Sequence, residues 1–451
     1  MNKRTFIQKY AIAAAVIFSL AYPRILYVHP DSTLHHIYQA LQMCGLNDTV
    51  LVAPSIYNEI NLSWPNRQGI HLMSESGAES TIINGSFAFT YTVDTTTVIN
   101  GFTIQNGSSW HGGGIFMQNS SPVISNNIII NNTVSGEGAR GGGIYFQNSS
   151  PIIRNNTIAD NISGGSGGGI EARYNSSGLI ANNTILRNQA STMGGGIYCE
   201  ESSPLIIHNL VKLDRAAIGA GICCSRSTSI IRHNTLIRNI ADGYGGGILC
   251  WCSSPLIDSC TIADNNGDGI CCQISSDPTI HYNNILDNVG NGVGNLDSTI
   301  IIDARYNWWG DTSGPGGFGP GLGDEVSRFV AYDPWLYEPP GAIEEKHPQP
   351  YPIQCKIWPN PFRDRVNIIF LATNSGNYSI VIYDVSGRLV KEFDSKNINT
   401  IRNKSSDATA TEFCCIWNGR DQNGFIVPGG VYLLRLQSGD YALTQKLLFL
   451  K

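Results

Sequence analysis

Charged residues are scarce in this chain of 451 residues. Lys, Arg, Asp and Glu make up 14% of the sequence, and 29 basic against 35 acidic residues give a formal net charge of −6. This composition provides no basic stripe, so nucleic acid is a poor partner. Long apolar runs are lacking too. Apart from residues 11–20, no stretch approaches the roughly 20 apolar residues that a membrane-spanning helix needs.

Glycine, by contrast, is abundant and follows a repeat. The sequence holds 49 glycines, and a Gly-x-Gly or Gly-Gly-Gly run recurs every 22 to 29 residues. A period of this size is typical of a solenoid, in which each repeat buries its apolar face only against its neighbours. Each run is followed by an isoleucine: Ile115, Ile144, Ile170, Ile197, Ile222, Ile248 and Ile270.

Two further apolar columns keep step with the first. Pro-x-Ile or a variant gives Ile124, Ile153, Ile180, Ile206, Ile231, Ile257 and Ile280. Asn-Thr-Ile or a variant gives Ile129, Ile158, Ile185, Val211, Leu236, Ile262 and Ile285. Strand side chains alternate between faces, so one inward column on each of three short segments predicts three strands and three bends per turn. The expected fold is a parallel β-helix.

Polar residues recur at the bends between these segments. One column holds Asn127, Asn156, Asn183, Asn209, Asn234, Cys260 and Asn283, and a second holds Asn132, Asn161, Asn188, Asp214, Asn239, Asn265 and Asn288. Stacked amides hydrogen-bond along such a column. We therefore interpret these asparagines as structural.

The repeat resembles the right-handed parallel β-helix proteins of the pectin-lyase-like superfamily. Residues 28–60, "VHPDSTLHHIYQALQMCGLNDTVLVAPSIYNEI", are similar to the opening segment of that family, with a short capping helix, a strand and an Ala-Pro-x-x-Tyr turn. Residues 306–326 and 332–336, "YNWWGDTSGPGGFGPGLGDEV" and "YDPWL", are similar to its final segment. The resemblance implies an all-β, three-stranded right-handed solenoid over residues 22–337. It says little about activity, because the superfamily includes lyases, glycosidases, esterases and non-catalytic surface proteins.

The two ends of the chain indicate export. Residues 1–21 have a basic start, a short apolar middle and small residues ending at Ala21, which is typical of a secretory signal peptide. An apolar strand or helix is the alternative reading of this segment. Residues 338–352 are rich in proline and charge and indicate a linker.

A second domain is expected over residues 353–451. Its short strands and glycine turns predict a small Ig-like β-sandwich. The motifs "WPNPFRDRVNIIF", "IYDVSGRLV", "WNGRDQNGFIVPGGVYLLRL" and "QKLLFLK" resemble the type A sorting domain of the type IX secretion system, and also the flagellar-hook-capping Ig-like domain. Its place at the C-terminus favours the sorting domain over an inert spacer or adhesion module. That resemblance implies a partner in the outer-membrane secretion machinery, and secretion or display on the outer surface of a Gram-negative bacterium.

The sequence has twelve cysteines, which in an exported chain often form disulfides. Eight lie between Cys199 and Cys272, and four of these share an inward column: Cys199, Cys224, Cys250 and Cys272. Buried cysteine packs as a small apolar residue, so we favour a packing ladder. Bridges between neighbouring turns are the alternative.

The outward positions of the first strand form the candidate binding face. Aromatic, acidic and amide side chains recur there. Aromatic rings stack on the faces of pyranose sugars, and polar side chains form hydrogen bonds with sugar hydroxyls. An extracellular or cell-surface polysaccharide is therefore a predicted partner, and cross-strand stacking that only stabilises the sheet is the alternative. The candidate substrate-binding residues are Tyr145, Glu171, Arg173, Tyr198, Glu200 and Trp251.

One pair among these residues suggests a glycosidase. Glu171 and Glu200 lie one turn and two residues apart, which places their Cα atoms roughly 8 Å apart. That spacing is in the range of the carboxyl pairs of inverting glycosidases. Pairing of Arg173 with Glu200 is the structural alternative.

Two charged columns suggest a lyase. They lack the clustered carboxylates of a strong calcium site, so an alternating-charge ladder on a solvated face is the simpler and favoured explanation. The columns are Arg238, Asp264 and Asp287, and Arg232, Asp258 and His281. The tryptophans of "NWWG", residues 307–310, suit a sugar site or a cap on the core, and their place after the last turn favours the cap.

The repeats vary in length by only a few residues, which leaves little room for the long loops of an enzyme cleft. No cofactor or metal ion is indicated, calcium included. The sequence therefore favours a secreted or cell-surface protein without catalysis, which binds glycan or serves as a surface interaction module. The alternative is a polysaccharide lyase or glycoside hydrolase that acts on an extracellular polysaccharide.

Overall fold

The computed structural model describes residues 23–136, 138–340 and 355–450, without 359, 361, 373–377, 385–387, 394–398, 404–410 and 439–440. The expected signal peptide, and most of the expected linker, lie outside the described residues. The chain divides into two compact units, residues 1–343 and 344–451. No helix within the described ranges is long and apolar enough to cross a membrane.

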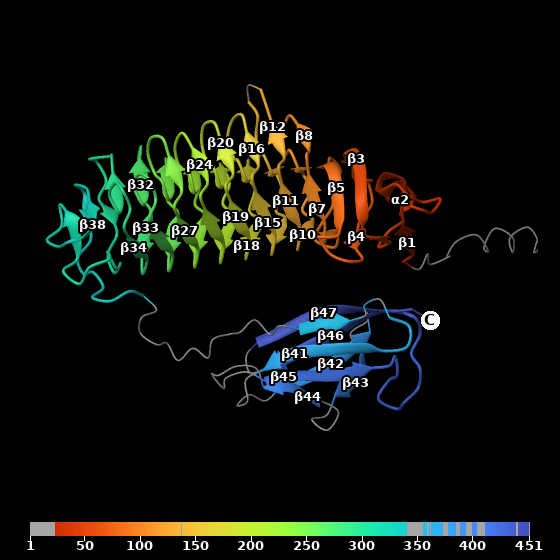
Figure 1. Ribbon diagram of the computed structural model, residues 1–451. Helices are drawn as coiled ribbons and strands as arrows, with labels where there is room; N and C mark the ends of the chain where they lie inside the picture. Colours follow the sequence, from red (N-terminus) through yellow and green to blue (C-terminus); the bar gives the residue numbers. More distant parts are fainter. Residues whose placement is uncertain are drawn as a thin grey trace, which may run out of the picture. The chain divides into compact units, whose positions relative to one another are not determined.

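The first unit winds as a parallel β-helix (Figure 1). One turn consists of β13 (Ile144–Gln147), β14 (Ile152–Arg154), β15 (Thr157–Ala159) and β16 (Ile162–Ser163), and the next turn begins at β17 (Ile170–Arg173). Each strand pairs in parallel with the same strand one turn later, so Ile144 lies beside Ile170 and Ile153 beside Ile180. The three expected strands per turn are confirmed. The two-residue fourth strand was not expected from the sequence.

The four strand positions form columns, which we call first to fourth. The first column is β9 (Ile115–Gln118), β13, β17, β21 (Ile197–Glu200), β25 (Ile222–Ser225), β29 (Ile248–Trp251), β32 (Ile270–Gln273) and β35 (Val293–Asn295). The second is β6 (Val98–Asn100), β10 (Val123–Ser125), β14, β18 (Leu179–Ala181), β22 (Leu205–Ile207), β26 (Ile230–Arg232), β30 (Leu256–Asp258), β33 (Thr279–His281) and β36 (Ile302–Asp303). The third is β7 (Thr103–Gln105), β11 (Ile128–Ile130), β15, β19 (Thr184–Leu186), β23 (Leu210–Lys212), β27 (Thr235–Ile237), β31 (Thr261–Ala263) and β34 (Asn284–Leu286). The fourth is β8 (Ser108–Ser109), β12 (Thr133–Val134), β16, β20 (Gln189–Ala190), β24 (Arg215–Ala216) and β28 (Ile240–Ala241).

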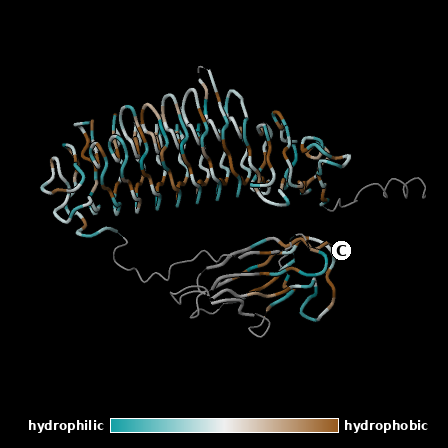
Figure 2. Tube along the Cα trace, in the orientation of Figure 1, coloured by the Kyte–Doolittle hydropathy of each residue, from teal (hydrophilic) through white to brown (hydrophobic). Residues whose placement is uncertain are grey.

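The core is built as the isoleucine columns predict. The isoleucines of all three columns are fully buried and belong to one continuous apolar cluster. Figure 2 shows the hydrophobic segments recurring at the same place on successive turns. The thiols of Cys199, Cys224, Cys250 and Cys272 are also fully buried in this cluster and form no disulfide. They pack as the expected ladder.

Hydrogen-bonded ladders hold the bends. In each asparagine column, the backbone N–H and the side-chain amide of one residue donate to the Oδ1 of the next, as from Asn156 to Asn183 at 3.0 and 3.1 Å. Cys260 interrupts one column, and Asp214 interrupts the other. A third ladder, which the sequence analysis missed, joins the backbone N–H of Ser120 to the hydroxyl of Ser149 and recurs from Ser253 to Ser276.

Both ends of the solenoid core are covered. Before the first full turn lie β1 (Ile25–Val28), α2 (Ile37–Met43), β2 (Thr49–Val52), β3 (Ser55–Ser63), β4 (His71–Ser74) and β5 (Thr81–Phe89). The helix buries Ile37 and Leu41, and the Glu59 carboxylate accepts a 2.6 Å hydrogen bond from the N–H of Ile37. At the far end, Trp308 and Trp309 are buried, and Trp309 joins the core cluster, so the expected tryptophan cap is confirmed. The last strands there are β37 (Pro315–Gly317), β38 (Gly323–Val326) and β39 (Val330–Ala331).

The second unit contains two four-stranded antiparallel sheets. Their strand orders are β40-β41-β45-β44 and β43-β42-β46-β47. The strands are β40 (Cys355–Trp358), β41 (Val366–Ala372), β42 (Tyr378–Asp384), β43 (Leu389–Phe393), β44 (Asn399–Asn403), β45 (Thr411–Trp417), β46 (Gly430–Ser438) and β47 (Tyr441–Phe449). Ile368 and Trp417 of one sheet and Ile380 and Leu434 of the other share one buried cluster. This is the expected small β-sandwich.

Candidate functional site

The outer face of the first column is covered over most of its length by the glycine-rich loops. In every repeat but that of Gly267, the first glycine of the run has a positive φ and lies over the first outward residue of the strand that follows. A Cβ on Gly167, whose φ is +62°, would lie 2.4 Å from the Cβ of Glu171. The same relation joins Gly141 to Tyr145 and Gly194 to Tyr198. Only glycine permits both this backbone conformation and this approach.

The covering loops contradict part of the expected binding face. Tyr145, Glu171, Arg173 and Tyr198 are buried, whereas the sequence analysis placed them on an exposed sheet. Alternation of strand side chains does point them away from the core. The loops bury them from the other side. Glu200 and Trp251 are partly exposed.

The buried polar residues form a charge cluster across three turns. Arg173 lies between the carboxylates of Glu171 and Glu200, with 3.5 Å from its Nε to Oε1 of Glu171. Arg226 donates to Glu200 at 2.7 Å and to Glu201 at 2.9 Å. The expected pairing of Arg173 with Glu200 is therefore present, and both acids of the proposed glycosidase pair are held in ion pairs.

Glu171 has the most perturbed environment in this cluster. Its Oε2 accepts hydrogen bonds from the N–H of Gly141 at 3.1 Å and from the hydroxyl of Ser166 at 3.2 Å, and its Oε1 has no hydrogen-bond partner. Burial raises the pKa of Glu171 to about 7, against the opposing effect of the nearby Arg173 and Arg140 charges. A carboxyl with this pKa suits general acid catalysis. Its side chain is fully buried, however, so substrate has no access to it in this conformation.

Farther along the same face the covered residues become apolar. Tyr198, Cys223, Leu249 and Cys271 form a second small cluster beneath the loops, and Trp251 packs against it. The partly exposed Trp251 ring is thus held in place by this small apolar cluster. It offers less surface to a ligand than the sequence analysis expected.

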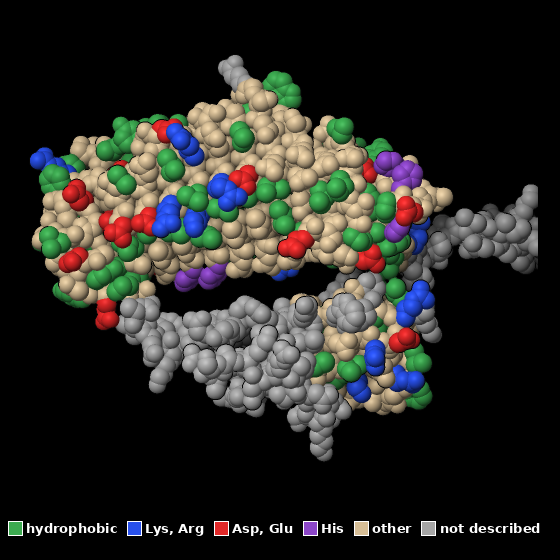
Figure 3. Space-filling view, viewed as in Figure 1, with side chains coloured by type: hydrophobic (Ala, Val, Ile, Leu, Met, Phe, Trp, Pro, Cys, Tyr) green, Lys and Arg blue, Asp and Glu red, His purple; other side chains and the backbone are tan. Residues whose placement is uncertain are grey.

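The two charged columns are ion-pair ladders. Arg232 pairs with Asp258 at 2.7 Å, and Arg238 with Asp264 at 3.3 Å. Among the described residues, no group of three or more His, Cys, Asp or Glu side chains is placed to hold a metal ion. Figure 3 shows basic and acidic side chains intermixed along the visible side of the solenoid. This agrees with the alternating-charge interpretation.

The outer face opens where the covering loops begin. The turn of β5, which precedes the turn of β9, has no glycine loop, because β5 runs without a break from a pairing with β7 into a pairing with β9. Ala88 lies beside Phe116 there, and the turn of β5 adds no loop to the covering row, which begins with Gly112 over the backbone of Phe116. The result is a groove of about 450 Å³, which we call the Trp110 groove. Its lining includes Asn61, Ser86, Ser108, Trp110, His111 and Phe116.

The Trp110 groove combines aromatic surface with hydrogen-bonding groups. Trp110 is 72% exposed, and the Phe116 ring stacks on Tyr145 with 5.8 Å between centroids. The His111 ring also stacks on Tyr145, at 5.2 Å, and its Nδ1 has no hydrogen-bond partner. Such a mixture of open aromatic faces and polar side chains suits a sugar.

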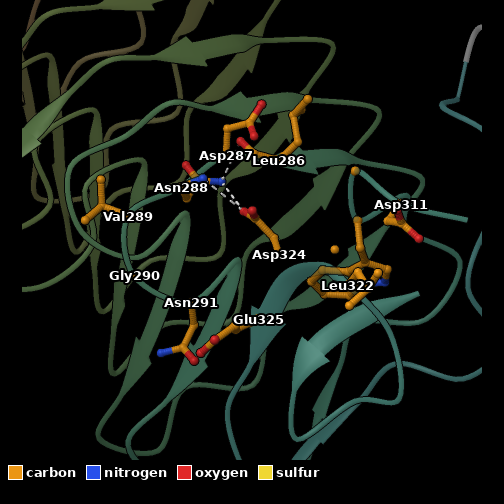
Figure 4. Close-up of a pocket in the computed structure, with 13 residues that line it drawn as sticks. Leu286, Asp287, Asn288, Val289, Gly290, Asn291, Asp311, Leu322, Asp324 and Glu325 are labelled. Carbon is orange, nitrogen blue, oxygen red and sulfur yellow. Dashed lines mark hydrogen bonds between the residues drawn. The ribbon is translucent and has the colours of Figure 1, made fainter. Parts of the chain in front are cut away.

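A second cavity, of about 440 Å³, lies at the far end of the solenoid (Figure 4). Asp287, Asp311, Asp324 and Glu325 line it. Asp324 accepts hydrogen bonds from the backbone and side-chain N–H groups of Asn288, at 3.2 and 2.8 Å. It therefore stands where the next member of an asparagine ladder would stand. Burial raises its pKa to about 6. The cavity holds one end of a structural ladder and gives no second sign of a ligand site.

Sequence reasoning missed the residues that form the open groove. Two of them, Trp110 and His111, stand directly before the first glycine run. A tryptophan outside the core columns was the available signal. Which outward positions stay open depends on the path of the loops, and the repeat pattern does not reveal that path.

Comparisons with known proteins agree with the two-unit organisation. The family of the right handed beta helix region matches residues 55–255 and 219–316, and the secretion system C-terminal sorting domain matches residues 356–410. Among solved structures, a mutant of the periplasmic alginate epimerase AlgG is 16% identical, with a TM-score of 0.38, over 64% of this chain and 73% of that chain. The enzymatically active domain of tailspike protein 2 of bacteriophage CBA120 is 10% identical, with a TM-score of 0.35, over 88% of this chain and 72% of that chain. No curated protein matches the chain. The two structural likenesses are too distant to bear on activity.

Proposed function

Since the chain belongs to the right-handed β-helix family and carries a C-terminal sorting domain, we propose that it is an exported glycan-binding protein that engages its ligand at the Trp110 groove. The sorting domain supports export by a type IX secretion system. It also supports display on, or release from, the outer surface of a Gram-negative cell. The solenoid is then the part that meets extracellular material.

The exposed ring of Trp110 beside Phe116 is the observation that carries the binding proposal. An indole with 72% of its surface exposed costs free energy in water, because apolar surface gains from burial. A ligand bound in the groove would cover the exposed face of the indole and so recover this free energy. Asn61, Ser86 and Ser108 surround the rings with amide and hydroxyl groups that match sugar hydroxyls.

Binding without turnover is favoured over hydrolysis or elimination. Glu171 is the one carboxyl of the first-column face whose pKa suits an acid catalyst, and it is sealed beneath Gly141 and Gly167. Glu200 is neutralised by two arginines. A glycosidase pair needs a substrate between its two carboxyl groups, whereas Arg173 occupies that place here.

A binding and turnover screen tests the proposal. The purified full-length mature protein is titrated with soluble extracellular polysaccharides, with and without calcium, and each mixture is examined for products. We expect saturable binding and no products. Trp110→Ala should weaken binding by about tenfold or more, because removing a stacked ring costs on the order of 1.4 kcal/mol.

Tyr244→Ala is the matched control. Tyr244 is also an exposed aromatic residue of a loop, 51% exposed, on a later turn. Its loss should leave binding unchanged. Absence of binding to every glycan would contradict the proposal. Products that disappear in Glu171→Gln would replace it with the hydrolase or lyase alternative.

A further inference from the structure

The lining of the Trp110 groove carries no Lys, Arg, Asp or Glu side chain. Its polar groups are the amide of Asn61, the hydroxyls of Ser86 and Ser108, and the imidazole of His111. Asn61 and Ser86 already share one hydrogen bond, of 2.9 Å, from the serine hydroxyl to the amide oxygen. These groups donate and accept hydrogen bonds without fixing a charge.

His111 adds to this uncharged character. Its ring packs flat on Tyr145, with 29° between planes, and its Nδ1 has no partner in the protein. Burial lowers the pKa of His111, and the charges of Arg140 and Arg173 lower it further. At neutral pH the ring is therefore uncharged and offers a hydrogen bond but no positive charge.

One guanidinium, that of Arg140, stands beside the groove, on the residue that pairs with His111. Arg140 hydrogen-bonds to the hydroxyl of Tyr145 and faces the carboxyl of Glu171. The Tyr145 hydroxyl in turn donates to Oε1 of Gln147 at 2.7 Å. Arg140 lies beside His111 on the next turn and lowers the pKa of that ring, but it does not line the groove, and it also interacts with Tyr145 and Glu171.

A network of amides extends the same surface beyond the groove. Asn84, on β5, donates to Asn58 at 2.8 Å and accepts from Gln105 at 2.9 Å and from Asn106 at 3.2 Å. Asn58 and Asn84 lie on the strands that also supply Asn61 and Ser86. The ligand surface therefore continues from aromatic rings to neutral amides.

From these placements we infer that the Trp110 groove recognises an uncharged hexose segment of a glycan rather than a uronate or sulfated segment. The inference rests on the glycan-binding function proposed above. A carboxylate or sulfate bound in the groove would lose hydration and gain no cationic partner from the residues that line it, which is costly. A neutral ring instead stacks on Trp110 or Phe116, and its hydroxyls meet groups that both donate and accept.

The experiment compares two matched sets of oligosaccharides with the full-length mature protein. One set is neutral (gluco-, xylo- and manno-oligosaccharides) and the other is anionic (oligoalginate and oligogalacturonate of equal length). We expect at least one neutral ligand to bind about tenfold or more tightly than any anionic one. Its affinity should change less than about twofold between low and high salt, because no charge pair is screened.

Two variants complete the test. Trp110→Ala should abolish the preference by weakening the neutral ligand. Ser108→Arg adds a cation to an exposed position of the lining, and should raise affinity for the anionic set while leaving the fold intact. Tight binding of only the anionic set would overturn this inference and leave the glycan-binding function standing. Binding of neither set would overturn both, and neutral binding that survives Trp110→Ala would overturn the assignment of the site.

Discussion

Phe116 and Glu171 occupy the same position of the same strand column two turns apart, yet their surroundings differ completely. Phe116 borders an open groove, whereas Glu171 is sealed under a glycine loop. The strand geometry is the same in both places. The difference lies in the loop that follows the fourth column, which is absent from the turn of β5, beside Phe116, and present in the turns on both sides of Glu171. In this solenoid the covering segment, rather than the sheet, decides which outward residues are available.

The largest effect is expected from breaking the charge cluster in the covered region. Arg173→Leu removes the ion-pair partner that the carboxyl groups of Glu171 and Glu200 share. It should lower the free energy of unfolding by about 3–5 kcal/mol. Chemical denaturation at pH 7 measures this change. Arg226→Leu is the control: its side chain is half exposed, so we expect about 1 kcal/mol or less. Equal losses in the two variants would show that the cluster is not effectively buried.

The pH dependence of stability is a second test of the covered region. The folded protein holds the Glu171 proton up to a pKa of about 7, above the ordinary value of 4.5, so it binds more protons than the unfolded chain between these values. Stability from this group is therefore complete below pH 4.5 and is lost as the pH rises toward 7, by roughly 3 kcal/mol. Glu171→Gln should flatten this part of the profile.

Asp214 titrates over an overlapping window, because burial raises its pKa to about 8. It is present in both the wild type and the Glu171→Gln variant, so the difference between the two profiles isolates Glu171. Parallel profiles would mean that Glu171 is hydrated in solution. The distinction between covered and open turns would then fail.

A substitution in the covering loop itself should have a smaller effect. Gly167→Ala places a Cβ against Glu171 at a φ of +62°, and should cost about 2–3 kcal/mol through steric displacement and left-handed strain. Gly138→Ala is the matched control, since its φ is +77° and nothing lies within 4 Å of the new Cβ. That control should cost about 1 kcal/mol. Thermal unfolding of both variants checks the difference.

The smallest effect on stability is expected in the open region. Trp110→Ala removes an exposed side chain and should change the free energy of unfolding by less than about 0.5 kcal/mol. Binding to glycan should weaken by about tenfold or more in the same variant. A large loss of stability would show that the ring is a structural element, and that the open groove is not a ligand site.

Much of the fold was predictable because each column repeats one physical requirement. Ile153, Ile180 and Ile206 fill equivalent places in a narrow core. Asn156 and Asn183 satisfy the hydrogen-bonding groups of equivalent bends. The spacing of these residues alone therefore indicates the solenoid. The serine ladder was not predicted, because hydroxyls in a Ser-Ser-Pro bend have many other uses. The outward residues were misjudged for a different reason. The alternation rule correctly turned Tyr145 and Glu171 out of the core, but it contains no information about a loop folding back over them.

The candidate site was harder to predict than the fold. Tyr198 and Trp251 stand in regular columns and so attracted attention, whereas Trp110 stands outside every column. The groove exists because one turn departs from the repeat. A method based on periodicity is least informative where the period is broken.

The end of one asparagine ladder also limits the length of the solenoid. From Asn132 to Asn288, nearly every side chain both receives a hydrogen bond from the preceding turn and donates one to the following turn. Asp324 receives from Asn288, but as a carboxylate it has no N–H to pass on. Asp214, inside the same column, is also a carboxylate, but its backbone N–H donates to Asn239, so the column continues there through the main chain. The backbone N–H of Asp324 donates instead to the carbonyl of Trp309, so neither the side chain nor the main chain carries the column past this turn.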